Sequence, residues 1–259
     1  MPISMSSVWD ESIALIKRER HLMLPLALAT IGVGSAISEV MQPAMPGAPT
    51  SAVGGLGMIA GLFLNVIGSL ALTALALTPG ISVGDSLRLG VARLPKILGI
   101  VVIFVLATFL LMIPLIITLG ASGITEKVDF SALPPIALFM ALVIGAVIIY
   151  LGARLLTINA LVVDSNPPII ETIKASFAAT QGIAGKIVGV ILLFLIVTIV
   201  VGGAAAAIFG LLFGMVGKAI GAPLLGKVLV ALINGLVSAL LSIVSTVFVA
   251  MLYRKLSAE

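Results

Sequence analysis

Long apolar runs separated by short polar segments dominate the chain, and these runs predict its elements. A helix that crosses the hydrocarbon core of a bilayer needs about 20 predominantly apolar residues. Six segments meet or approach this length, the first being the shortest; they cover approximately residues 22–38, 55–77, 97–119, 135–155, 187–210 and 228–251. The pattern predicts an all-α integral membrane protein with six transmembrane helices, forming a single membrane domain over residues 1–259.

A polar segment with helical periodicity precedes each pair of apolar runs. Ser7 with Asp10 and Ser82 with Asp85 fit the capping box that starts many helices. The third segment begins near Pro168, a residue suited to a first helical turn. We therefore expect three repeats of an interfacial amphipathic helix plus a transmembrane hairpin, over approximately residues 7–77, 82–163 and 166–252.

Composition agrees with a bilayer as the surrounding solvent. Hydrophobic residues make up 61% of the chain and charged residues 9%, whereas a typical soluble domain has about 25% charged residues. The mean hydropathy is +1.35. So few charges could not cover this much apolar surface in water, which excludes a soluble fold.

The positive charges predict the orientation of the six helices. The connections 39–54, 120–134 and 211–227 hold three of the 14 basic residues, Lys127, Lys218 and Lys227. The remaining eleven lie near the termini or in the other connections: Lys17, Arg18, Arg20, Arg88, Arg93, Lys96, Arg154, Lys174, Lys186, Arg254 and Lys255. Because cytoplasmic segments retain Lys and Arg, both termini are predicted to be cytoplasmic.

Arg154 decides where the fourth helix leaves the membrane. At the centre of the span it would cost roughly 2.5 to 3.5 kcal/mol, whereas at the end of a 136–155 span its guanidinium can reach the headgroups. We expect the second placement, with the residues up to Asp164 continuing beyond the hydrocarbon or against the protein. An ion pair between Arg154 and Asp85 or Glu171 is a further hypothesis.

The same region carries a family resemblance. An Arg at the end of the fourth span, an apolar run closing on Asp164, a proline pair, and the pattern E-T-I-x-x-S-F-x-x-T-x-G-x-x-x-K over residues 171–186 resemble bacterial six-helix membrane proteins. These are typified by the membrane domain of glycerophosphoryl diester phosphodiesterases. The resemblance implies the fold and a bacterial cytoplasmic (inner) membrane location. It does not imply phosphodiesterase activity, because that activity belongs to a separate soluble barrel.

The residue types that carry catalysis are scarce. His21 is the single histidine and the chain has no cysteine, so we expect no enzyme activity, cofactor or metal site. Glu39 and Arg154 are the ionisable residues nearest the membrane interior, and both fall near span ends. An intramembrane hydrolase would require acids and hydroxyls to converge in space. The scattered cations form no basic run typical of nucleic-acid binding.

Two polar stripes follow the second and sixth predicted helices at helical spacing. They consist of Asn65, Ser69 and Thr73, and of Asn234, Ser238, Ser242 and Ser245. Polar side chains of this kind commonly link neighbouring transmembrane helices by hydrogen bonds, which is the interpretation we favour. The alternative is a permease for a small neutral or lipid-like substrate, with the two stripes lining its route.

The cytoplasmic cations provide the leading hypothesis on function. Five of them, in the connections between spans, could contact anionic headgroups or a partner protein: Arg88, Arg93, Lys96, Lys174 and Lys186. We therefore expect a non-enzymatic role in membrane organisation, with membrane lipids, another membrane protein or a second copy of the chain as partner. A purely topogenic role for these cations remains the alternative.

Overall fold

The computed structural model describes residues 4–43, 49–122 and 134–258, and the regular elements of these residues are helices. In chain order they are α1 (Met5–Ala27), the π-helix η1 (Leu28–Gly32), α2 (Val33–Met41), α3 (Ala52–Leu77), α4 (Val83–Ala121), α5 (Pro135–Arg154), α6 (Ile158–Asp164), α7 (Ile169–Ala179), α8 (Ala184–Ala219) and α9 (Pro223–Ser257). Lys127 lies outside the described residues.

The structure confirms six helices that are long and apolar enough to cross a membrane. They are the continuous run α1–η1–α2, then α3, α4, α5 with α6, α8 and α9. Each expected span falls within one of these helices or, at the fourth span, ends one residue beyond α5. Hydrophobic run length was therefore sufficient to find the membrane helices.

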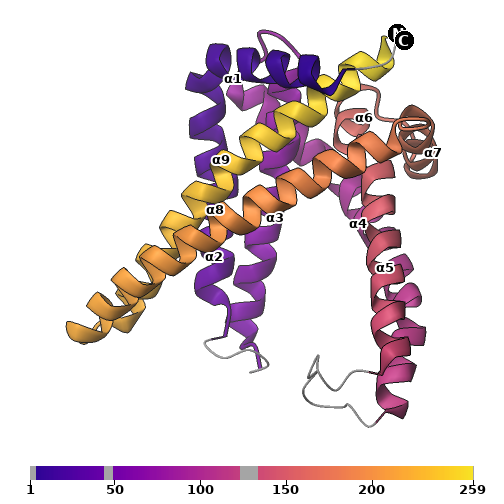
Figure 1. The fold of residues 1–259 in the computed structure, drawn as a ribbon. Helices are drawn as coiled ribbons and strands as arrows, with labels where there is room; N and C mark the ends of the chain where they lie inside the picture. Colours follow the sequence, from indigo (N-terminus) through magenta and orange to yellow (C-terminus); the bar gives the residue numbers. More distant parts are fainter. Residues whose placement is uncertain (1–3, 44–48, 123–133, 259) are drawn as a thin grey trace.

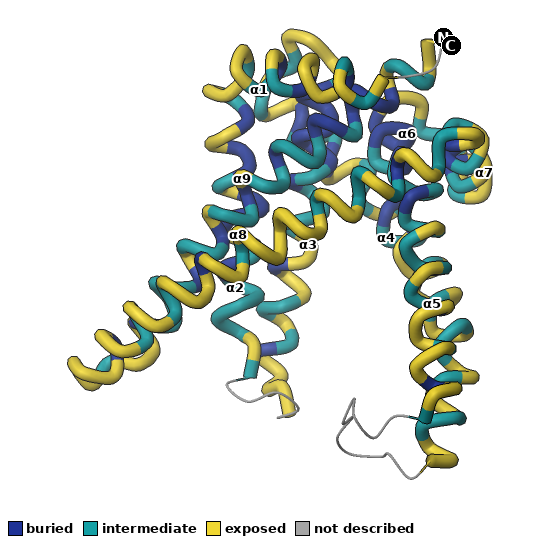
Figure 2. Tube along the Cα trace, in the orientation of Figure 1, coloured by how far each residue is buried: buried dark blue, intermediate teal, exposed yellow. Residues whose placement is uncertain are grey.

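The helices spread from one packed end of the molecule. Figure 1 shows the first part of α1 lying across this end, beside both termini, with α6 and α7 at the same level. The hairpin of α4 and α5 and the hairpin of α8 and α9 extend away from it in different directions. Figure 2 shows that buried residues gather at the packed end, while the far parts of both hairpins are mostly exposed. We call the packed end the inner end, because the termini lie there.

A local irregularity accompanies the change from α1 to the first span. Pro25 lies inside α1 and has no amide hydrogen to donate, and the π-helix η1 follows three residues later. Prolines and π-helical turns are the usual causes of sharp helix bends. The run from Met5 to Met41 can therefore turn from the surface of the inner end into the bundle without a break (Figure 1).

Glycines bring the first span close to its two neighbours. A Cβ on Gly34 would lie 2.7 Å from the carbonyl oxygen of Gly61, so α2 and α3 pack with their backbones nearly in contact. On the other side, a Cβ on Gly235 of α9 would overlap the carbonyl oxygen of Gly32 in η1. Small residues allow this approach between membrane helices, where dispersion contacts replace the hydrophobic effect as the source of attraction.

The main core lies at the inner end, between α1, α3 and the last turns of α9. Met23, Leu72 and Leu252 are almost completely buried in one cluster. A second cluster joins α3, α4 and α6 around Leu70 and Val162. The short helix α6 is thus packed into the protein, which is one of the two placements expected for the chain after Arg154.

The three expected interfacial segments differ from one another. Among the described residues, only the third segment forms a helix of its own, α7, separate from the membrane helix α8 that follows. The first segment is the start of α1, which continues through η1 into α2, and the second is the start of α4. Ser82 caps α4 as expected, with its hydroxyl 3.0 Å from the amide of Asp85. The box predicted at Ser7 is wrong, because α1 begins earlier, at Met5, and Ser7 lies inside it. The third segment starts one residue later than expected, with Pro168 as its N-cap.

The hairpin of α8 and α9 is longer than a bilayer crossing requires. At 1.5 Å per residue, the 36 residues of α8 span about 54 Å, against a hydrocarbon core of about 30 Å. Its charges, Lys186 and Lys218, lie near opposite ends. A helix this long fits a bilayer by tilting, and in Figure 1 α8 and α9 are inclined to α2 and α3.

Candidate functional site

The candidate site is the cationic surface of the inner end, built from α4, α7 and the start of α8. Of its five predicted residues, Arg88, Lys174 and Lys186 are exposed, whereas Arg93 and Lys96 are half-buried. Arg88 lies early in α4, Lys174 on α7 and Lys186 in the first turn of α8. Three of the five cations are therefore free to meet a headgroup or a partner.

Lys96 has an internal role. Its ammonium donates a hydrogen bond to the carbonyl oxygen of Asn166 at 2.9 Å, and further ones to the side-chain oxygen of Asn166 and the carbonyl oxygen of Pro167. The turn between α6 and α7 needs such a donor, because Pro167 and Pro168 supply no amide hydrogens and Asn166 has a positive φ of 50°. Lys96 thus fastens α4 to this turn.

Arg154 lies against aromatic rings. The described residues contain no ion pair between Arg154 and Asp85 or Glu171 within 4.0 Å, so the structure does not support that hypothesis. The guanidinium carbon instead lies 5.0 Å from the ring centre of Phe177 and 6.0 Å from that of Tyr150. A cation over an aromatic face is stabilised without a carboxylate. Arg154 is the last residue of α5, as its predicted place at the end of the span requires.

The buried face of α7 consists of hydroxyl residues. Thr172, Ser176 and Thr180 are all completely buried. The hydroxyl of Ser176 donates to the carbonyl oxygen of Arg154 at 2.7 Å. It also lies 2.9 Å from the hydroxyl of Thr157. Sequence reasoning missed this contact, although the spacing of the three hydroxyls at four-residue intervals was a visible signal.

The end of α9 ties the inner end together. The Tyr253 hydroxyl donates to the Asp164 carboxylate at 2.8 Å and so joins α9 to α6. Lys255 forms an ion pair with Glu11 at 2.8 Å and donates to the hydroxyl of Ser7 at 2.7 Å. These links hold α1, α6 and α9 as one unit beneath the exposed cations.

One asparagine of each polar stripe forms a hydrogen bond with α2. Ser35 of α2 donates to the side-chain oxygen of Asn65 at 3.2 Å, and Asn234 donates to the carboxylate of Glu39, one turn further along α2, at 2.8 Å. Within α3 the hydroxyls of Ser69 and Thr73 donate to carbonyl oxygens of their own helix. The asparagines therefore link helices: Asn65 joins α3 to α2, and Asn234 joins α9 to α2.

The rest of the second stripe lies beside α8. Ser238, Ser242 and Ser245 line a cavity of about 190 Å³ together with Thr198 and Phe194. Ser245 donates within its own helix, to the carbonyl oxygen of Ser242 at 3.3 Å. Asn65 is not among the described residues that line this cavity.

The described residues bring together no group of three His, Cys, Asp or Glu side chains that could hold a metal ion. His21 is exposed on α1. The inner end presents exposed lysine and arginine side chains, which can form ion pairs and hydrogen bonds.

Comparison with known proteins gives no relative: no protein-family model, curated protein or solved structure matches this chain. The resemblance of residues 171–186 to the phosphodiesterase membrane domain therefore stays a prediction.

Proposed function

We propose that this chain is a multi-pass protein of a bacterial cytoplasmic membrane, with both termini in the cytoplasm, that associates with anionic lipid through its inner end and catalyses no reaction. The eleven-to-three distribution of basic residues supports this orientation. So does the position of the two termini beside one another at the inner end (Figure 1).

The main support for the lipid proposal is the face by which α7 is attached to the protein. Its hydroxyl face packs on the protein, which leaves Ile170 57% exposed and Lys174, one turn later, exposed beside it. An apolar and a cationic side chain on the free side of a short helix suit the boundary between acyl chains and headgroups. Arg88 and Lys186 add exposed positive charge on the two neighbouring membrane helices.

The permease alternative has less support. It requires the two stripes to line a shared polar route, whereas Asn65 and Asn234 each bond to a different residue of α2. Interhelical hydrogen bonds of this kind hold membrane bundles together. We therefore assign both asparagines to packing.

Native mass spectrometry of the purified protein with mixed phosphatidylglycerol and phosphatidylcholine tests the lipid proposal. A basic residue at a membrane surface contributes about 1 kcal/mol to anionic-lipid binding. Replacing Arg88 and Lys174 together by glutamine should therefore lower the preference for phosphatidylglycerol about 30-fold. Lys218→Gln, at the exposed outer end of α8, is the matched control and should leave it unchanged. An unchanged preference in the double variant would reject the proposal.

A further inference from the structure

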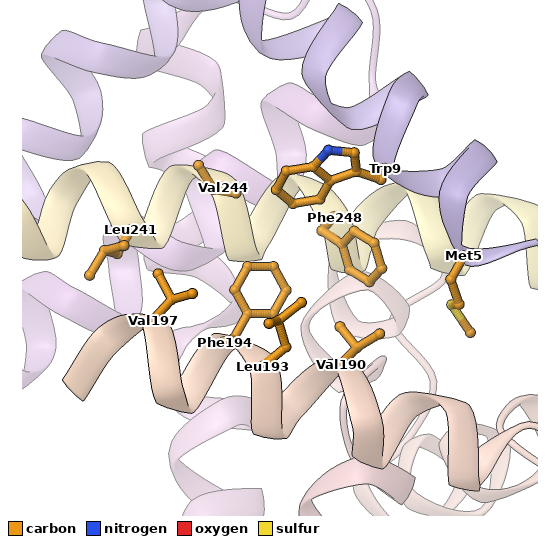
Figure 3. A pocket seen from close by; sticks show the side chains of 9 residues that line it. All are labelled: Met5, Trp9, Val190, Leu193, Phe194, Val197, Leu241, Val244 and Phe248. Atoms are coloured by element: carbon orange, nitrogen blue, oxygen red, sulfur yellow. The ribbon is translucent and has the colours of Figure 1, made fainter. Parts of the chain in front are cut away.

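A concave apolar surface lies where α1 crosses α8 and α9. Figure 3 shows Trp9 of α1, Phe194 and Val197 of α8, and Val244 and Phe248 of α9 around it. Its volume is about 440 Å³, within the range of about 300–1,000 Å³ typical of small-molecule sites. In the described part of the chain, its lining residues are all apolar. We call this surface the inner groove.

Aromatic side chains form the inner groove. The rings of Trp9 and Phe248 have their centres 6.4 Å apart, and those of Phe194 and Phe248 are 5.7 Å apart in an edge-to-face arrangement. The first contact joins α1 to α9, and the second joins α8 to α9. Trp9 nevertheless remains 42% exposed, so the groove is open to its surroundings beside this side chain.

A positive charge lies at the headgroup end of the inner groove. Lys186 precedes Val190, which lines the groove, by four residues and so lies on the same face of α8, about 6 Å nearer the inner end. Lys186 is exposed. The ion pairs within 4.0 Å among the described residues are Arg18–Glu19 and Lys255–Glu11, so Lys186 is not neutralised by one.

We propose that the inner groove holds one acyl chain of an anionic glycerophospholipid whose phosphate lies at Lys186. The lining helices α8 and α9 are long and apolar enough to span a membrane, which would place lipid around the groove. An occupant must be apolar along the groove and negatively charged at the Lys186 end, which matches this lipid class. The inference rests on the proposed association with anionic lipid and adds a defined site to it.

The proposed lipid must prefer the groove over the surrounding bilayer because of its headgroup charge and because of the concave shape of the groove. Lipid tails are as apolar as the groove, so burial of the chain alone gives no selectivity. The concave shape fixes one chain in place, and Lys186 attracts the phosphate. Removal of this charge should weaken binding about fivefold, which corresponds to about 1 kcal/mol.

Trp9 is the single tryptophan of the chain and provides the assay. The full chain, in dodecyl maltoside micelles, is titrated with phosphatidylglycerol that carries bromine atoms on one acyl chain. Bromine quenches a nearby indole, so occupancy of the groove should lower Trp9 emission in a saturable way. Unlabelled phosphatidylglycerol should compete about fivefold better than phosphatidylcholine, and Lys186→Gln should remove this difference.

Val197→Phe fills the groove, whereas Ile199→Phe adds a ring to the opposite, 63% exposed side of the same helix. Val197→Phe should weaken the saturable quenching at least tenfold and Ile199→Phe should leave it unchanged. Both variants must elute as single species, with the wild-type Trp9 emission in the absence of lipid. If Val197→Phe fails this criterion, the inference is tested by Lys186→Gln and by the competition between phosphatidylglycerol and phosphatidylcholine.

Three results would overturn the inference: quenching that rises linearly without saturation, quenching that Val197→Phe leaves intact, or equal competition by the two lipids. The Arg88 and Lys174 double variant separates this inference from the proposed function. If Trp9 quenching does not saturate but the double variant still lowers the preference for phosphatidylglycerol, the groove is rejected and the proposed function stands. If Trp9 quenching saturates but the double variant leaves the preference for phosphatidylglycerol unchanged, the groove stands and the wider lipid-binding surface is rejected.

Discussion

The contact between α9 and η1 provides the sharpest prediction. Gly235→Ala places a methyl group against the backbone of η1, where it would overlap the Gly32 carbonyl oxygen and lie 3.4 Å from the Cβ of Ala36. Gly203→Ala, in the middle of α8, places the same methyl group where nothing lies within 4 Å. The two substitutions are chemically identical and differ in their surroundings.

The expected magnitudes follow from two opposing terms. Alanine favours a helix over glycine by about 0.8–1.0 kcal/mol, and this gain applies to both variants. Overpacking at Gly235 costs about 1–3 kcal/mol, because the obstructing atoms belong to a backbone that cannot rotate away. Gly203→Ala should therefore be the more stable variant, by about 1–3 kcal/mol. At roughly 2–4 °C per kcal/mol, its Tm should be higher by about 2–12 °C.

Thermal unfolding of both purified variants in the same detergent measures this difference. The fraction that remains monodisperse after heating, and the emission of Trp9, give two independent readings of Tm. Wild-type protein serves as the reference for each. A Gly235→Ala variant as stable as Gly203→Ala would show that α9 and η1 are not in backbone contact, and would refute the packing that places Asn234 against α2.

Three further predictions concern the polar links and the orientation. Lys96→Met should lower the stability by roughly 1.5 kcal/mol, the low end for charged hydrogen bonds at a half-buried site, as measured by thermal unfolding. Asn234→Leu should cost about 1–3 kcal/mol because the Glu39 carboxylate loses its donor, and adding Glu39→Gln should recover part of this loss. The chain has no cysteine, so Ser257→Cys should react with an impermeant thiol reagent only from the cytoplasmic side and Lys218→Cys only from the other side; labelling of both from one side would contradict the orientation.

The membrane helices were predictable because their signal is local. A run of about 20 apolar residues identifies a candidate span whatever it packs against. The insertion cost of Arg154 predicted where the chain leaves the hydrocarbon, and α5 also ends at this residue. The Ser82 cap is likewise a contact between residues three positions apart. The early start of α1 was missed because serines at positions 4, 6 and 7 offer competing caps within one turn.

The partners of the polar residues were not predictable. Lys96 and Asn166 are 70 residues apart, and Asn234 and Glu39 are 195 apart, so only the tertiary fold brings them together. For α7, the sequence predicted an amphipathic helix at the membrane surface but not the face by which it is attached to the protein. The structure buries its hydroxyl face, because inside a membrane protein small polar residues can pack on the bundle while Ile170 faces outward at little cost.

The distribution of tight contacts indicates which parts of the molecule are fixed. In lipid, apolar contact between helices gains little over contact with acyl chains, so close backbone approach and hydrogen bonds must specify the packing. The inner end has such hydrogen bonds, made by Tyr253 and Lys255. The hairpin of α8 and α9 is fastened at its tip, where a Cβ on Gly226 would lie 2.5 Å from the carbonyl oxygen of Phe213.

Between the inner end and the tip of the hairpin, a Cβ on Gly202 or Gly203 of α8 would meet no other atom within 4 Å. The hairpin is held instead through α9, which approaches η1 at Gly235, bonds to α2 through Asn234 and contacts α1 through Phe248 and Trp9. The inner groove lies at this attachment. Trp9 both lines this groove and contacts Phe248 of α9, so the occupant proposed there would touch a side chain that attaches α1 to the hairpin.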